Sequence, residues 1–163
     1  MLKFQTSLGS FLVELHTEDA PISCKNFLEY VSAGHFDGTV FHRVIPNFVI
    51  QGGGLTADMA QKKTRASIKN EASNGLKNRR GSLSMARTND PDSATSQFFV
   101  NLKDNAFLDP SRGNAGYAVF AHVMEGMEVV DKIAAVQTGS RGHHEDVPVE
   151  PVMLESVTLL KKS

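Results

Sequence analysis

The sequence of 163 residues contains a single cysteine and no tryptophan. Since Cys24 has no partner in the chain, an internal disulfide is excluded, which is typical of a reducing compartment and not of a small secreted scaffold. A charge excess of one sign is also missing, because 17 basic and 18 acidic residues leave a net charge of −1. No global field therefore steers the chain toward nucleic acid or an anionic membrane.

Long apolar runs are absent as well. No stretch approaches the roughly 18 apolar residues of a membrane span. The N-terminal residues alternate in polarity and lack the continuous apolar segment of a signal peptide. We therefore expect a cytoplasmic protein with no membrane partner. Because the length is close to that of one domain, residues 1–163 are predicted to form a single domain with its own core.

Two segments carry helical periodicity. Residues 19–34 place apolar side chains at i, i+3, i+4 and i+7, namely Cys24, Phe27, Leu28 and Val31. Residues 126–136 also carry an apolar stripe at helical spacing, formed by Met127, Val130, Ile133 and Ala134. The rest of the chain holds about eight short β-branched or aromatic runs separated by Gly, Asn, Asp and Pro. This pattern predicts a mainly β fold, an antiparallel barrel or sandwich with two helices packed outside.

Alternation along the strands supports two further predictions, and one long polar span supports a third. Residues 2–15 form two alternating runs around Leu8 and Gly9, which is typical of a hairpin. Phe98 and Phe99 are adjacent in one run, so they face opposite sides; if one is core, the other lines something else, such as a pocket. The long polar span 56–80 is predicted to be an excursion from the sheet, a kind of loop that is often functional.

Several motifs suggest other chemistries, but each has a simpler interpretation. GGGLTA at 52–57 matches a dinucleotide-binding pattern, yet no amphipathic helix or parallel strand follows, which favours a glycine bend. His143 and His144 could face a metal, but neighbours on a strand point apart, which favours a solvated loop. Cys24 lies on an apolar stripe, which favours a buried thiol over a nucleophile. The basic clusters QKKTR and LKNRR lack aromatic partners, which favours solvated loops over nucleic-acid contact.

The strongest signal is a set of motifs in fixed order: FHRVIPNFVIQGG, GSLSMAR, SATSQFFVN, FLD and YAVFAHVMEGMEVVD. In order and spacing the chain resembles the cyclophilins, the cyclophilin-type peptidyl-prolyl cis-trans isomerases, from about Phe4 to Leu160. The segment NEASNGLKNRRGSLSMART resembles the bacterial cytoplasmic branch of that family. The resemblance implies an eight-stranded antiparallel β-barrel closed by two α-helices, with the active site in a groove on its outer face.

The resemblance also implies roles for individual residues. It places catalysis on Arg43, Gln51, Phe48 and Phe99. It implies substrate-binding positions at Val49, Met85, Ala86, Arg87, Gln97, Phe107, Leu108 and Tyr117. The implied reaction is rotation about X–Pro peptide bonds, which assists protein folding. Such a rotation breaks no covalent bond, so we expect no nucleophile, metal or cofactor; a fixed donor such as Arg43 suits the transition state.

Three positions depart from the pattern of the family. Many cyclophilins have tryptophan where this chain has Phe107, methionine at Val49 and histidine at Tyr117. The lost indole N–H implies weakened affinity for cyclosporin-type ligands. The altered groove leaves a second hypothesis open, a proline-peptide binding module or holdase chaperone with incidental turnover. We expect proline-containing peptides and unfolded protein chains as partners, neither nucleic acid nor membrane, and a monomer.

Overall fold

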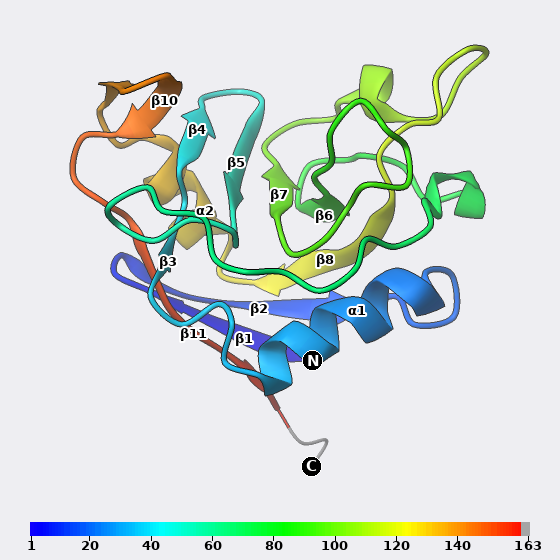
Figure 1. Ribbon diagram of the computed structural model, residues 1–163, viewed down its shortest axis with the longest axis horizontal. Coiled ribbons are helices and arrows are strands. Elements are labelled where there is room, and N and C mark those ends of the chain that lie inside the picture. The colour runs from blue at the N-terminus through cyan, green and yellow to red at the C-terminus, as the bar shows by residue number, and fades with distance from the viewer. Residues whose placement is uncertain (161–163) are drawn as a thin grey trace.

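The computed structural model describes residues 1–160, which fold mainly into antiparallel sheet (Figure 1). The strands are β1 (Leu2–Thr6), β2 (Gly9–Leu15), β3 (Thr39–Val40), β4 (Arg43–Ile45), β5 (Val49–Gly52), β6 (Ser82–Met85), β7 (Phe98–Asn101), β8 (Val119–Glu125), β9 (Thr138–Arg141), β10 (His144–Pro148) and β11 (Met153–Leu159). The helices are α1 (Pro21–Ser32), α2 (Met127–Ala134) and the short 3-10 helices η1 (Ala72–Asn74) and η2 (Ala106–Leu108). Within residues 1–160, none of these helices has the length and apolar character that crossing a membrane requires.

Nine strands form one sheet in the order β3-β11-β1-β2-β8-β6-β7-β5-β4. The two edge strands, β3 and β4, are separated in the chain by only Phe41 and His42. The run 39–45 therefore pairs with β11 at one end and with β5 at the other, which curls the sheet into a half-barrel (Figure 1). The predicted mainly β antiparallel architecture with two helices is confirmed, and counting β3 and β4 as one interrupted strand yields the eight expected.

The core lies inside the curled sheet and is rich in phenylalanine. Phe4, Phe27 and Phe98 have no exposed surface, and the ring of Phe98 meets those of Phe4 and Phe27 edge-on at 5.6 Å. Helix α1 contributes Cys24, Phe27 and Tyr30 to this core, and α2 contributes Val129, Val130 and Ile133. Both helices begin and end close to the predicted positions, and the β1–β2 hairpin forms around Leu8 and Gly9 as predicted.

The segment around His143 and His144 is a correction to the sequence analysis. It was expected to be a solvated loop, but it forms the β9–β10 hairpin beside β4 (Figure 1). The sequence pattern did not predict these strands, because most residues of β9 and β10 are polar and at least partly exposed. Only Val147 and Pro148 are buried, so packing against β4 stabilises these strands more than alternation does.

His42 is a buried titratable group in the link between β3 and β4. Its side chain is 7% exposed, and its Nδ1 atom has no hydrogen-bond partner within the described part of the chain. The pKa of His42 is lowered from 6.5 to about 4, mainly by burial and in smaller part by the neighbouring His144 and Arg43. The imidazole is therefore neutral in the folded protein at neutral pH.

We expect His42→Phe to make the fold less sensitive to mild acid. Between about pH 6.5 and pH 4 the unfolded chain protonates this histidine and the folded chain does not, so the free energy of unfolding falls as pH falls. From this residue alone the loss between pH 7 and pH 5 is about 2 kcal/mol. Urea unfolding at both pH values measures it. The pKa of His16 and of His35 is also lowered, so a smaller loss persists in the variant. An undiminished loss would show that His42 is not the group responsible.

Candidate active site

The β4–β5 hairpin brings Arg43 and Gln51 together. Its turn has Pro46 at the second position and Asn47 at the third, where φ is 60°, and Phe48 N donates to Ile45 O at 3.1 Å. Proline followed by a residue with positive φ is the signature of a type II turn, and asparagine tolerates that conformation well. The resulting register sets Arg43 directly opposite Gln51.

The same row continues across the sheet from Gln51 to Phe99 on β7. Side chains in one row share a face, so Arg43, Gln51 and Phe99 all project from the outer face of the sheet. The rows on either side point into the core: one contains Ile50 and Val100, the other contains Phe98, and all three side chains are fully buried. The prediction that Phe98 and Phe99 serve different surroundings is therefore confirmed.

A cavity of about 320 Å³ opens beside this row on the outer face. Its apolar wall is a small cluster separate from the main core: Phe48, Val49, Ala86, Phe99, Leu108 and Tyr117. The remaining lining residues are Arg43, Gln51, Arg87 and Phe107. The cavity thus combines an apolar wall, two cations and a neutral amide, the chemistry expected of a site for an apolar ring beside a polar peptide group.

Arg43 is an exposed cation held by a neutral partner. Its Nη1 donates to Gln51 Oε1 at 3.2 Å, and Gln51 Nε2 donates to Gln97 Oε1 at 3.0 Å. The guanidinium carbon lies 5.9 Å from the centre of the Phe48 ring. Among residues 1–160 no carboxylate forms an ion pair with Arg43. Its positive charge is therefore oriented without being neutralised, and it stays available to a ligand.

The glycines that follow Gln51 make room for this chain of amides. A Cβ on Gly54 would lie 2.6 Å from Gln97 Cγ and Nε2. Gly53 has a φ of +95°, and its Cβ would lie 2.9 Å from Ser96 O. The glycine bend expected from GGGLTA is therefore a close approach of two backbones, with Gln97 filling the space of the missing side chain.

Buried asparagines hold the wall of the cavity from behind. Asn105 Nδ2 donates to Phe48 O at 3.0 Å, and Asn105 O accepts from Leu108 N at 2.9 Å. Asn78 Nδ2 donates to Tyr117 O at 3.2 Å, and Tyr117 N donates to Leu108 O at 2.9 Å. Both asparagines are at most 1% exposed. Buried hydrogen bonds of this kind rigidify their surroundings, so the apolar wall has a fixed shape.

Arg87 closes the far side of the cavity. Its Nε and Nη2 donate to Gly116 O at 3.2 and 3.0 Å, and its guanidinium carbon lies 4.4 Å from the centre of the Tyr117 ring. Three contacts to one short segment immobilise both side chains.

A second cavity of about 290 Å³ adjoins the first and shares Gln51, Ala86 and Arg87 with it. Gln97 belongs to this second cavity. The sequence analysis missed its other lining residues: Gln61, Thr64, Thr88, Ser93 and Thr95. Two of them, Gln61 and Thr64, lie on the polar span 56–80, which forms the predicted excursion, so the length of that loop was the available signal.

Met85 is the one expected site residue that the structure places elsewhere. It pairs with Phe98 across β6 and β7, so it shares the core-facing side of the sheet. Its side chain is 2% exposed, belongs to the main core and lines neither cavity. The neighbouring Ala86 points into the groove instead, because successive residues of an extended chain face opposite sides.

Cys24 is a structural thiol, as its position on the helix stripe predicted. It is 1% exposed, and Sγ donates to Phe120 O at 3.3 Å. Burial raises the pKa of this thiol to about 12, so the nucleophilic thiolate is not populated at neutral pH. Within the described residues, no group of three or more His, Cys, Asp or Glu side chains is placed to hold a metal ion.

Comparison with known proteins agrees with this geometry. The sequence model of the family "Cyclophilin type peptidyl-prolyl cis-trans isomerase/CLD" matches residues 1–159. A peptidyl-prolyl cis-trans isomerase of Acinetobacter baylyi is 58% identical over 98% of this chain and 85% of its own length. Peptidyl-prolyl cis-trans isomerase B of Escherichia coli is 52% identical over 98% of this chain and 99% of its own.

Solved structures show the same fold. A cyclophilin of Cryptosporidium parvum, crystallised in the presence of the dipeptide Ala-Pro, superposes with a TM-score of 0.82 at 24% identity and covers 99% of both chains. The family match over nearly the whole chain and the high identity to curated isomerases lead to one conclusion: the chain belongs to the cyclophilin-type peptidyl-prolyl cis-trans isomerases.

Proposed function

We propose that Arg43 is the catalytic residue of this isomerase and that the apolar cavity beside it holds the proline ring. The observation that carries this assignment is the single row of Arg43, Gln51 and Phe99 at the edge of a cavity with one apolar wall. Ala-Pro accompanies the Cryptosporidium parvum relative in its crystals, which supports an X–Pro ligand here.

The chemistry requires a donor aimed at the prolyl nitrogen. Amide resonance sets a barrier of about 18–20 kcal/mol to rotation about the X–Pro bond. In the twisted transition state resonance is lost and the proline nitrogen gains a lone pair. A guanidinium that donates to this nitrogen stabilises the transition state more than the planar ground state, which lowers the barrier. Shortening the time of cis–trans exchange from about 100 s to about 1 ms requires lowering the activation barrier by roughly 7 kcal/mol.

The other groove residues have supporting roles. Gln51 orients Arg43 through its amide oxygen and adds no charge that would weaken the cation. Phe48, Phe99 and Leu108 grip the proline ring and exclude water, which strengthens the field of the guanidinium. Ala86 and Arg87 lie where a bound peptide backbone would pass between the two cavities. With the ring held, the preceding carbonyl is the part that turns.

The second cavity would hold a side chain that flanks the proline. It adjoins the proline cavity, and its lining consists of hydroxyl and amide side chains together with Ala86 and Arg87. These groups can exchange hydrogen bonds with a polar substrate side chain, whereas an aliphatic one would leave them unpaired. The cavity therefore favours polar residues near the proline over aliphatic ones.

In the cell we expect this isomerase to assist protein folding in the cytoplasm, as a single-domain monomer acting on unfolded chains. The high identity to curated isomerases favours an enzyme over a binding module with incidental turnover, and so does the charge of Arg43, whose hydrogen-bond partner Gln51 is neutral. Refolding of a protein limited by an X–Pro bond tests this role. Catalytic amounts of the isomerase should remove the slow refolding phase without changing the final yield of refolded protein. A higher yield with an unchanged slow phase would instead support a holdase.

Replacing Phe107 by tryptophan should restore affinity for cyclosporin. Phe107 is 63% exposed at the rim of the cavity and stacks on Phe48 with ring centres 5.6 Å apart. An indole at this position adds an N–H donor, and one new hydrogen bond corresponds to about a tenfold gain in affinity. Calorimetric titration of both proteins with cyclosporin measures the gain, and Phe107→Tyr is the matched aromatic control. Equal affinity of Phe107→Trp and wild type would contradict the role of the indole.

A further inference from the structure

The walls of the second cavity are loops, and something must hold them in place. One wall is residues 61–64 of the long excursion, and the other is the connection 88–97 between β6 and β7. Neither segment belongs to a helix or to a strand of the curled sheet. A site built on loops has a fixed shape only where neighbouring elements anchor its backbone.

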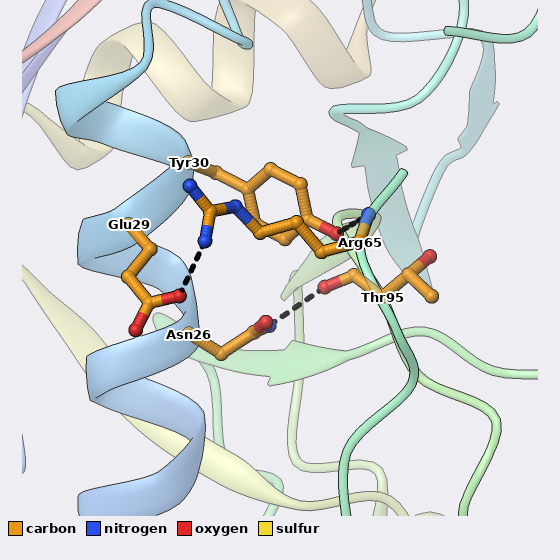
Figure 2. Close-up of polar contacts among 5 residues, drawn as sticks. All are labelled: Asn26, Glu29, Tyr30, Arg65 and Thr95. Carbon is orange, nitrogen blue, oxygen red and sulfur yellow. Dashed lines mark hydrogen bonds and ion pairs between the residues drawn. The ribbon is translucent and has the colours of Figure 1, made fainter. Parts of the chain in front are cut away.

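Helix α1 supplies that anchor through two buried side chains (Figure 2). Tyr30 Oη accepts a hydrogen bond from Arg65 N at 2.8 Å, directly after the cavity residue Thr64. Asn26 Nδ2 donates to Thr95 O at 2.7 Å, and Thr95 itself lines the cavity. Tyr30 and Asn26 are one turn apart on α1, so the same face of one helix reaches both walls.

The anchoring groups are inaccessible to solvent, whereas a nearby ion pair is not. Tyr30 is 2% exposed and Asn26 is 7% exposed. Arg65 also forms an ion pair with Glu29 at 2.8 Å, but these side chains are 53% and 40% exposed (Figure 2). Exposed pairs contribute little, while a buried hydrogen bond fixes its partner. The long excursion is also joined to the second wall just beyond residues 61–64, because Ile68 N donates to Ala94 O at 3.0 Å.

We propose that Tyr30 and Asn26 are positioning residues that set the preference of this isomerase for the residues flanking the proline. The inference rests on the proposed function of the second cavity. Neither residue lines that cavity or the proline cavity, so neither touches the substrate. They act through Thr64 and Thr95, by fixing the spacing of the two walls between which a flanking side chain lies.

Tyr30→Phe is the sharpest test, because it removes one hydroxyl and leaves the buried ring in place. The substrates are short peptides with one proline in which each neighbouring position is alanine, glutamine or leucine in turn. The measured quantity is the ratio of kcat/KM for the glutamine peptide to that for the leucine peptide. We expect a ratio above about 3 in the wild type and a ratio near 1 in Tyr30→Phe. The all-alanine peptide should be turned over within about twofold by both.

Two further variants separate positioning from general loosening. Asn26→Ser withdraws the hydrogen bond to the other wall, so it should flatten the same ratio. Glu29→Gln breaks the exposed ion pair at the same junction, and its ratio should match the wild type. Circular dichroism and thermal unfolding confirm that each protein is folded at the assay temperature. A mere loss of stability lowers turnover of all peptides together and leaves the ratio unchanged.

The outcomes distinguish this inference from the function on which it rests. A wild-type ratio of 1 at every position would mean that the second cavity does not read flanking residues, and the proposed function of that cavity would fail. A wild-type ratio above about 3 that persists in Tyr30→Phe and Asn26→Ser would overturn the positioning role alone. An equal change in Glu29→Gln would also overturn it, because the ion pair does not belong to the buried anchor.

Discussion

Arg43→Ala is expected to reduce kcat/KM for an X-Pro-Phe peptide by about 100- to 1000-fold, the range seen when one transition-state donor is removed. The guanidinium forms its one side-chain hydrogen bond in residues 1–160 with Gln51, and that neutral partner leaves its charge directed at the cavity. Because Arg43 is exposed and has no ion pair among the described residues, its removal should change the free energy of unfolding by less than about 0.5 kcal/mol. Activity and stability should therefore separate.

Arg43→Lys is the matched control for charge. Lysine keeps the positive charge but lacks the planar guanidinium, which can donate to Gln51 and to the substrate at the same time. We expect activity between that of the wild type and that of Arg43→Ala. Prolyl exchange measured by a coupled assay or by NMR, with urea unfolding of each protein, supplies both quantities. If Arg43→Ala turns over the peptide at the wild-type rate while folded, the assignment of Arg43 as catalytic residue is wrong.

Much of the fold follows from local chemistry that can be read in the sequence. Alternation around Leu8 and Gly9 predicted the first hairpin, and Pro46 with Asn47 explains why the second reverses where it does. The adjacent Phe98 and Phe99 had to separate into core and groove, since neighbours on a strand face opposite sides. These features depend only on residues close together in the chain.

Features that depend on distant residues could not be predicted in this way. Strand β10 exists because it packs against β4, about 100 residues earlier, and its own sequence has no strand pattern. The family resemblance placed Met85 in the groove, but its pairing with Phe98 places it in the core. The second cavity is formed by two loops that meet only in the folded chain, so its hydroxyl-bearing residues carry no local signature.

Phe98→Ala and Phe99→Ala should differ in what they damage, although the two residues are neighbours. Phe98 is fully buried, and its ring meets four others edge-on at 5.6 to 6.0 Å: Phe4, Phe27, Phe36 and Phe41. Its truncation leaves a cavity inside the half-barrel, which should cost about 3–5 kcal/mol of stability. Phe99 faces the groove, so water can enter the space it vacates and the stability cost should be smaller.

The activities should follow the opposite order. Removing the Phe99 ring withdraws one apolar wall from the proline, a loss of roughly 1–2 kcal/mol of transition-state binding and about tenfold in kcat/KM. Phe98 belongs to the main core and lines neither cavity, so the folded fraction of Phe98→Ala should retain nearly full activity. Urea unfolding and prolyl exchange at low temperature measure both, and Phe98→Leu is available if the alanine variant does not fold. An equal loss of activity per folded molecule in the two variants would contradict this prediction. It would mean that a cavity left at Phe98 shifts the Phe99 ring, so that damage to the core also damages the groove.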